Sequence, residues 1–167
     1  MEPPTTTDPN TSAPTPELTH LTTLAAAKIP TSPIYAFLLT PLTITSARRG
    51  HFTARLPLSA PHLNSSGSLH GAVSAAIVDW AGGMAIASWD LRAKTGVSVD
   101  IHVTYQSGAR AGDEVEIEGV CERVGGSLAF TRVGVYRVEG GERGRAVATG
   151  THTKFVKGTE PQKAEAS

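Results

Sequence analysis

The chain has 167 residues, and its 15 Lys and Arg balance its 15 Asp and Glu, so the formal net charge is zero. This length is enough for one domain with a hydrophobic core, and neutrality argues against a nucleic acid or an anionic membrane surface as the main partner. The single cysteine, Cys121, excludes an internal disulfide. Without a basic and apolar leader or an apolar stretch of about 20 residues, we expect a cytoplasmic protein without a membrane span, with mitochondrial and peroxisomal locations left open.

Composition divides the chain into three parts. Residues 1–16 are rich in Pro, Thr and Ser and are expected to form a disordered extension, residues 17–157 the folded domain, and residues 158–167 a flexible polar tail. The domain is expected to open with a helix over Glu17–Lys28 and, further on, two strands over Leu42–Ala47 and His51–Leu58. Between them, the apolar stretch Ile34–Leu39 is too short to assign to a helical turn or to an extended piece.

The longest expected element is a helix over His70–Leu91, which follows a loop over Asn64–Ser68. Its apolar residues cover every side, which is typical of a buried helix. After it we expect four strands joined by short hairpin links, over Val97–Tyr105, Glu114–Arg123, Ser127–Val138 and Arg145–Val156. The pattern predicts an α+β domain in which one antiparallel sheet wraps around a long central helix.

Alternation within two of these strands predicts which residues share a face. In the first strand the odd-numbered residues from Val97 to Tyr105 are apolar, and Ser98 falls on the opposite, polar face, where it could hold a water. In the second strand Glu114, Glu116 and Glu118 are expected to face water.

The central helix carries an isolated acid. Between Gly71 and Leu91 the only charged residues are Asp79 and Asp90. An ionised carboxylate is costly to bury without partners. Asp79 is therefore expected to have either a structural partner, such as a backbone group, or a chemical use.

The start of the same helix has complementary chemistry. The first N–H groups of a helix lack internal partners and carry partial positive charge. Gly71 has no side chain to block a substrate oxygen from its N–H, which is the chemistry of an oxyanion site. Asn64 and His70 could add donors to the same oxygen, although a histidine here is also an ordinary helix cap.

Helix geometry separates the acid from the helix start. Asp79 follows His70 by nine residues, which is about half a turn out of phase and about 13 Å along the axis, and Gly71 lies about 12 Å away by the same count. If both ends belong to one site, a second copy of the chain must join them, and a two-fold dimer with antiparallel central helices would make two equal sites. The neighbours of Asp79 at helical spacings suit either such an approach or tight packing on the sheet, because most are small: Ala72, Ala75, Ala76, Gly82, Gly83 and Ile86.

Several segments together resemble the hotdog-fold acyl-CoA thioesterases. They are Asn64-x5-His70-Gly71-x7-Asp79, Gly96-Val-Ser-Val-Asp-Ile-His-Val-Thr-Tyr105, Leu128-Ala-Phe-Thr131 and Ala148-Thr-Gly-Thr-His-Thr-Lys154. The most similar branch contains the phenylacetate-pathway thioesterases and the mammalian thioesterase-superfamily small enzymes. The chain departs from that pattern at Ala72, where the family usually has a second glycine.

The resemblance implies a hotdog fold, a required homodimer that pairs into a homotetramer, and hydrolysis of an acyl-CoA thioester with no cofactor beyond the CoA of the substrate. Asp79 would be the general base or the nucleophile, and Ser98 would help to place the water. Across the dimer interface, the Gly71 N–H would bind the thioester oxygen, while Asn64 and His70 orient the thioester.

The resemblance also implies a path for CoA over two sets of strand ends, with its phosphates near Arg110, Arg123 and Lys154. The residues on this path are Tyr105, Ser107, Gly108, Arg110, Arg123, Gly125, Gly126, Ser127, Leu128 and Lys154.

Two other functions stay open on the sequence. One is a hotdog dehydratase or hydratase, which also uses His and an acid; the other is a non-catalytic module that binds acyl-CoA without cleaving it. The remaining histidines are scattered singly, so the sequence predicts no metal site.

Overall fold

A computed structural model describes residues 13–161. Residues 1–12 of the expected extension and residues 162–167 of the expected tail lie outside the described residues. The helices are α1 (Pro16–Lys28), α2 (Pro33–Leu39) and α3 (Gly71–Asp90), with a short 3-10 helix η1 (Ala60–His62). The strands are β1 (Thr43–Arg48), β2 (His51–Pro57), β3 (Val97–Tyr105), β4 (Glu114–Val124), β5 (Leu128–Glu139) and β6 (Glu142–Phe155).

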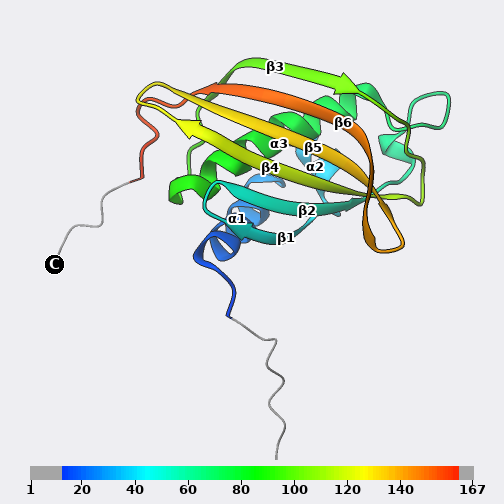
Figure 1. Ribbon diagram of the computed structural model, residues 1–167, viewed down its shortest axis with the longest axis horizontal. Coiled ribbons are helices and arrows are strands. Elements are labelled where there is room, and N and C mark those ends of the chain that lie inside the picture. The colour runs from blue at the N-terminus through cyan, green and yellow to red at the C-terminus, as the bar shows by residue number, and fades with distance from the viewer. Residues whose placement is uncertain (1–12, 162–167) are drawn as a thin grey trace, which may run out of the picture.

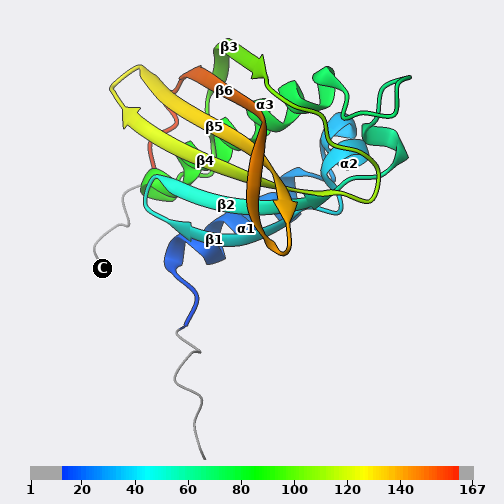
Figure 2. The ribbon, with the colours of Figure 1, turned by 45° about the vertical axis from the view of Figure 1, so that its right-hand side comes forward.

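The described strands form one antiparallel sheet in the order β1-β2-β4-β5-β6-β3. The sheet curves around α3, with the helices on its concave side (Figure 1). Seen from a second direction, α2 lies near the start of α3, while α1 lies near β1 (Figure 2). This arrangement confirms the predicted α+β architecture of a sheet wrapped around a long central helix.

Prolines explain how the two N-terminal helices begin. Pro16 and Pro33 stand in the first turns of α1 and α2, where a missing N–H costs nothing. Thr15 caps α1 by accepting a hydrogen bond from the Leu18 N–H at 3.1 Å. The stretch that the sequence left unassigned, Ile34–Leu39, is therefore helical, and it buries Leu38 and Leu39.

The central helix α3 contributes more buried apolar residues to the core than any other described element. By length and composition it could cross a membrane, but 72% of its most apolar window is buried inside the protein. Its side chains pack against β4, β5 and β6 on the concave face of the sheet. The rest of the chain therefore covers the apolar surface of α3 on most sides. The flank that carries Asp79 stays partly exposed.

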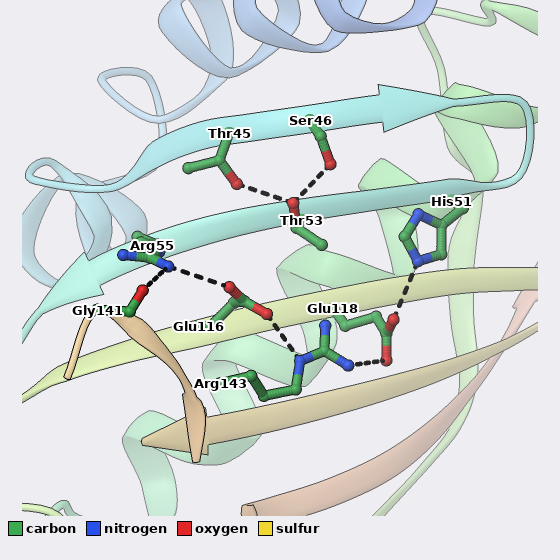
Figure 3. A network of polar contacts seen from close by, with 9 residues as sticks. All are labelled: Thr45, Ser46, His51, Thr53, Arg55, Glu116, Glu118, Gly141 and Arg143. Carbon is green, nitrogen blue, oxygen red and sulfur yellow. Dashed lines mark hydrogen bonds and ion pairs between the residues drawn. The ribbon is translucent and has the colours of Figure 1, made fainter. Parts of the chain in front are cut away.

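The outer face of the sheet carries a network of ion pairs (Figure 3). Glu118 accepts from His51 Nε2 at 3.0 Å and from Arg143 Nη1 at 3.1 Å, and Glu116 accepts from Arg143 Nε at 2.7 Å. The glutamates do lie on the outer face, but cations from β2 and β6 partly cover them. Burial opposes ionisation of Glu118, yet the hydrogen bonds from His51 and Arg143 lower its pKa overall.

We expect Arg143→Met to reduce the free energy of unfolding by about 1 kcal/mol, because it leaves the mostly buried carboxylates of Glu116 and Glu118 without their shared partner. The measurement is urea unfolding at neutral pH. The matched control is Arg132→Met, which removes a more exposed pair with Glu122 and should change the free energy by less than about 0.5 kcal/mol. Equal effects of the two variants would contradict a special role for the network.

Candidate active site

The Asp79 carboxylate lies on the flank of α3, between α2, β3 and β6. Its Oδ2 accepts from the Tyr35 hydroxyl at 2.5 Å, and its Oδ1 accepts from Ser98 Oγ at 3.2 Å. The side chain is 34% exposed. Both partners are side chains rather than backbone groups, and the carboxylate still reaches the surface, so a ligand can approach it.

A buried histidine continues this contact. His152 Nε2 lies 2.9 Å from Ser98 Oγ and 3.6 Å from Asp79 Oδ1, and the residue has no exposed surface. Burial lowers the pKa of His152, and the charge of Lys154 lowers it further, against an opposing effect of Asp79. The ring is therefore neutral, and the hydrogen-bond pattern assigns the proton to Nε2, which donates to Ser98 while Ser98 donates to Asp79.

A β-bulge places Ser98 on this side of the sheet. Ser98 pairs with Lys154 and Ile101 with His152, with a register shift between Ser98 and Asp100. Directly paired residues of antiparallel strands share a face, and Lys154 and His152 lie on the same face of β6 because they are two residues apart. Ser98 therefore faces α3 together with Ile101. The expected strict alternation, with Ser98 and Ile101 on opposite faces, is wrong because the bulge inserts one residue between them.

Lys154 lies beside the acid rather than on an open surface. It is only 7% exposed, and no residue among 13–161 forms an ion pair or a side-chain hydrogen bond with its ammonium group. It lines a small cavity of about 80 Å³ together with Tyr35, Asp79 and Met84. Burial lowers the pKa of Lys154, and the nearby charge of Asp79 opposes that shift.

The start of α3 presents several free donors. His70 caps the helix, its Nδ1 accepting from the Ala72 N–H at 3.0 Å, which leaves the proton on the exposed Nε2. Asn64 uses its side-chain oxygen in the loop, accepting from the N–H groups of Ser66 and Ser68, so its amide NH2 remains available. Within the described residues, the Gly71 N–H donates to no protein acceptor.

The acid and these donors lie at opposite ends of β3. Ser98, next to Asp79, is the second residue of the strand, whereas the hydroxyl of Tyr105 at its other end donates to the Gly71 carbonyl at 3.2 Å. Seven residues of extended strand span about 23 Å. The structure therefore brings Asp79 and Ser98 together, brings Asn64, His70 and Gly71 together, and keeps the two groups apart within one chain.

The residues expected on the CoA path divide in the same way. Ser107, Gly108 and Arg110 follow Tyr105, near the start of α3. There, a cleft of about 410 Å³ is lined by Ser66, Ser68, Gly108, Arg110, Asp113, Arg137 and Arg145. At the other end, Arg123 lies near the end of β4, the β4–β5 turn carries Gly125, Gly126 and Ser127, and Leu128 opens β5 and pairs with Phe155 beside Lys154.

Sequence reasoning missed four residues of these sites: Tyr35, His152, Arg137 and Arg145. Tyr35 stood in an unassigned stretch, and His152 was one of several scattered histidines. Both arginines belong to the long β5–β6 hairpin, whose position over the loop at Ser66 depends on the sheet order. Only His152 had a sequence signal, because it lies in the Ala148–Lys154 segment that carried the family resemblance.

Two other kinds of reactive site are not formed among residues 13–161. No group of three or more His, Cys, Asp or Glu side chains is arranged to hold a metal ion there. Burial raises the pKa of the Cys121 thiol to about 12, so this cysteine is not a nucleophile near neutral pH.

Known proteins are similar to this chain in both sequence and fold. The family model of the thioesterase superfamily matches residues 66–143. A Schizosaccharomyces pombe protein named as a candidate esterase is 37% identical over 73% of this chain and 73% of its own length. Human acyl-coenzyme A thioesterase 13 is 34% identical over 69% of this chain and 79% of its own length. The chain belongs to the thioesterase superfamily.

A solved structure extends the likeness to the whole fold. Mouse thioesterase superfamily member 2 superposes with a TM-score of 0.73 at 27% identity, covering 85% of this chain and 98% of that one. The expected hotdog fold and the expected class of enzyme, a thioester hydrolase, are thereby confirmed.

Gly82 tests how tightly this thioesterase holds His152. A Cβ on Gly82 would lie 2.5 Å from His152 Nδ1 and 2.9 Å from its Cβ. We expect Gly82→Ala to lower the free energy of unfolding by about 1–2 kcal/mol, because overpacking outweighs the helix propensity gained. The measurement is urea unfolding. Gly126→Ala, where a Cβ meets open space, is the control and should be nearly neutral; a Gly82→Ala protein as stable as this control would contradict the close fit.

Proposed function

We propose that this chain hydrolyses acyl-CoA thioesters at a site shared by two copies of the chain. The observation that carries the proposal is one helix with two incomplete halves of a site. Asp79, with Ser98, lies about 12 Å along α3 from the Gly71 N–H, which has no protein acceptor among residues 13–161. The acyl-CoA substrate is supported by the 34% identity with human acyl-coenzyme A thioesterase 13. That family membership also favours hydrolysis over the dehydratase and the non-catalytic binding alternatives.

The helix start supplies the oxyanion site. The Gly71 N–H sits at the positive end of the 20-residue helix α3, where negative charge that develops on the thioester oxygen is stabilised. The amide of Asn64 and the Nε2–H of His70 are the neighbouring donors that orient the thioester. Removing one such donor typically costs about 100- to 1,000-fold in rate.

The acid from the partner copy activates the attacking oxygen. As general base, Asp79 takes a proton from water while the water oxygen bonds to the carbonyl carbon; the C–S bond then breaks, and the thiolate of CoA recovers the proton. As nucleophile, Asp79 bonds to the carbonyl carbon and expels the thiolate, and water then cleaves the anhydride. Both routes end in free acid and CoA, and Ser98 assists either by holding the attacking group.

The edge strand β3 supports the dimer. Among the described strands it pairs only with β6, so its other edge is free. Val97 is 65%, Val99 58% and Tyr105 58% exposed. An apolar, unpaired edge strand invites pairing with another chain. If two copies of β3 pair antiparallel about a two-fold axis, the Gly71 end of one copy meets the Asp79 end of the other, and this gives two equal sites.

The arginine cleft would bind the phosphates of CoA. Arg110, Arg137 and Arg145 line it next to the loop that precedes Gly71, with Asp113 as the one acid. Arginine is well suited to phosphate because its guanidinium offers several donors in a fixed plane. The partner copy would bring Arg123 and its β4–β5 turn to the same site, and pairing of two dimers would complete the homotetramer.

The oxyanion role of Gly71 is tested by a matched pair of substitutions. Gly71→Pro removes the N–H at the first helical position, where proline is tolerated, and His70 already has the extended backbone that precedes proline, with φ −69° and ψ 135°. Gly71→Ala keeps the N–H and adds only a Cβ. We expect kcat to fall about 100-fold or more for Gly71→Pro and far less for Gly71→Ala, measured by release of free CoA thiol from acyl-CoA esters. Equal loss in both variants would mean that crowding, not the N–H, matters.

Mixed dimers test whether the site is shared. Asp79→Asn and Gly71→Pro homodimers should each be nearly inactive. Co-expressed in equal amounts, they should recover about a quarter of the parental activity, because half of the dimers are mixed and each mixed dimer has one intact site out of two. If differently tagged copies co-purify as mixed dimers yet stay inactive, each chain makes its own site.

A further inference from the structure

A helix that precedes the sheet reaches the acid of the proposed site. Tyr35 of α2 donates its hydroxyl to Asp79 Oδ2 at 2.5 Å, although the two residues are 44 positions apart. This is the shortest polar contact that Asp79 makes with a described residue, and it occupies the oxygen that Ser98 and His152 do not contact.

The tyrosine sits on a fixed support. Leu38 and Leu39 anchor α2 in the core. His62, itself buried, accepts from the Ser59 N–H through Nδ1 at 2.9 Å, so its Nε2 carries the proton and donates to the Leu38 carbonyl at 2.9 Å. A side chain on an anchored helix loses little further entropy on binding, so the hydroxyl can hold the carboxylate in one orientation.

We propose that Tyr35 is a positioning residue for the reaction, holding Asp79 Oδ2 so that Oδ1, beside Ser98, is the oxygen that acts on the substrate. The inference rests on the proposed function. A carboxylate that accepts one hydrogen bond on each oxygen has its rotation fixed, yet each oxygen keeps a second lone-pair direction. A water or the thioester carbon would approach on the Oδ1 side, where Ser98 Oγ lies 3.2 Å and His152 Nε2 3.6 Å from that oxygen.

The proton of this contact stays on Tyr35 throughout. Burial raises the pKa of Tyr35 far above its ordinary value, and the hydrogen bond and negative charge of Asp79 raise it further. The hydroxyl is therefore a donor to the carboxylate and neither a base nor a nucleophile near neutral pH. In the general-base route the proton from water goes to Oδ1 and then to the departing thiolate, and Tyr35 gives up none.

Other ionisable groups face Asp79 and remain when Tyr35 is changed. β6 contributes His152, which burial keeps neutral, and Lys154. α1 contributes Lys28, which lines the same small cavity, and β3 contributes only the hydroxyl of Ser98. A change in the pH profile on removal of the Tyr35 hydroxyl thus reports on that contact.

The experiment compares the parent, Tyr35→Phe and the control Tyr136→Phe over pH 5–9, with the parent first assayed on acyl-CoA esters of several chain lengths. Tyr136 lies on the outer face of the sheet, where Arg143 stacks on its ring, 4.4 Å from the ring centre. For Tyr35→Phe we expect kcat to fall about tenfold with KM changed less than about twofold, because the loss affects the reacting group and not binding. The pH dependence of its rate should differ from that of the parent, whereas the control should keep the parental pH dependence, because only Tyr35→Phe removes a donor beside the reacting carboxylate.

The outcomes separate the two proposals. A parent without turnover on any ester overturns the proposed function, and this inference with it. An active parent with an unchanged rate and pH profile in Tyr35→Phe overturns only the role of Tyr35. A lower kcat without a change in pH profile, together with a lower melting temperature than that of the control, would mark Tyr35 as structural and also overturn the role.

Discussion

The arrangement of this protein depends on keeping one carboxylate in the flank of an apolar helix. An ionised group there must be compensated, and the compensation comes from three elements distant in sequence. α2 brings the Tyr35 hydroxyl, β3 brings Ser98, and β6 brings His152 behind Ser98. Each of these side chains reaches the site only if its own element is correctly placed. The contacts of Asp79 therefore depend on the closure of the sheet around α3. A shift of β3 by one residue would remove the contacts of Ser98 with both Asp79 and His152.

In the proposed site, the same helix explains why one chain would be incomplete by itself. An α-helix has its free N–H groups at one end, whereas a side chain in its middle lies about two turns away. Lengthening or bending the chain cannot bring these two features together. The small residues beside Asp79 serve two purposes in the structure: Gly82 lets His152 of the same chain approach, while Ala72 stays exposed at the helix start. The interpretation of a uniformly small face open to a partner is therefore too simple, since part of it is filled from within.

Most of the secondary structure could be predicted because it rests on local patterns. Two-residue alternation located β3 and β4, strand patterns between short hairpin links located β5 and β6, and an apolar stretch from His70 to Leu91 located α3. The features that could not be predicted are either too short for a periodic pattern or depend on strand register. The helix α2 is seven residues long, too short for periodicity to tell a helix from a strand. His152 looks like any strand histidine until its pairing with Ile101 shows that it faces α3. The bulge at Ser98 leaves no mark in the composition, because it is set by the packing of β3 against β6.

The bulge also connects the proposed chemistry to the proposed dimer. Strict alternation would put Ser98 on the outer face whenever Ile101 and Tyr105 face the helix, because Ser98 is separated from each of them by an odd number of positions. One extra residue at the bulge lets β3 do both: Ser98 reaches Asp79, while Tyr105 reaches the carbonyl of Gly71 at the other end. Bulges are common near active sites for this reason, since they redirect one side chain without moving the strand. The edge strand that places the serine is also the strand whose free edge would receive the second copy, so a defect in β3 would impair the acid and the shared site together.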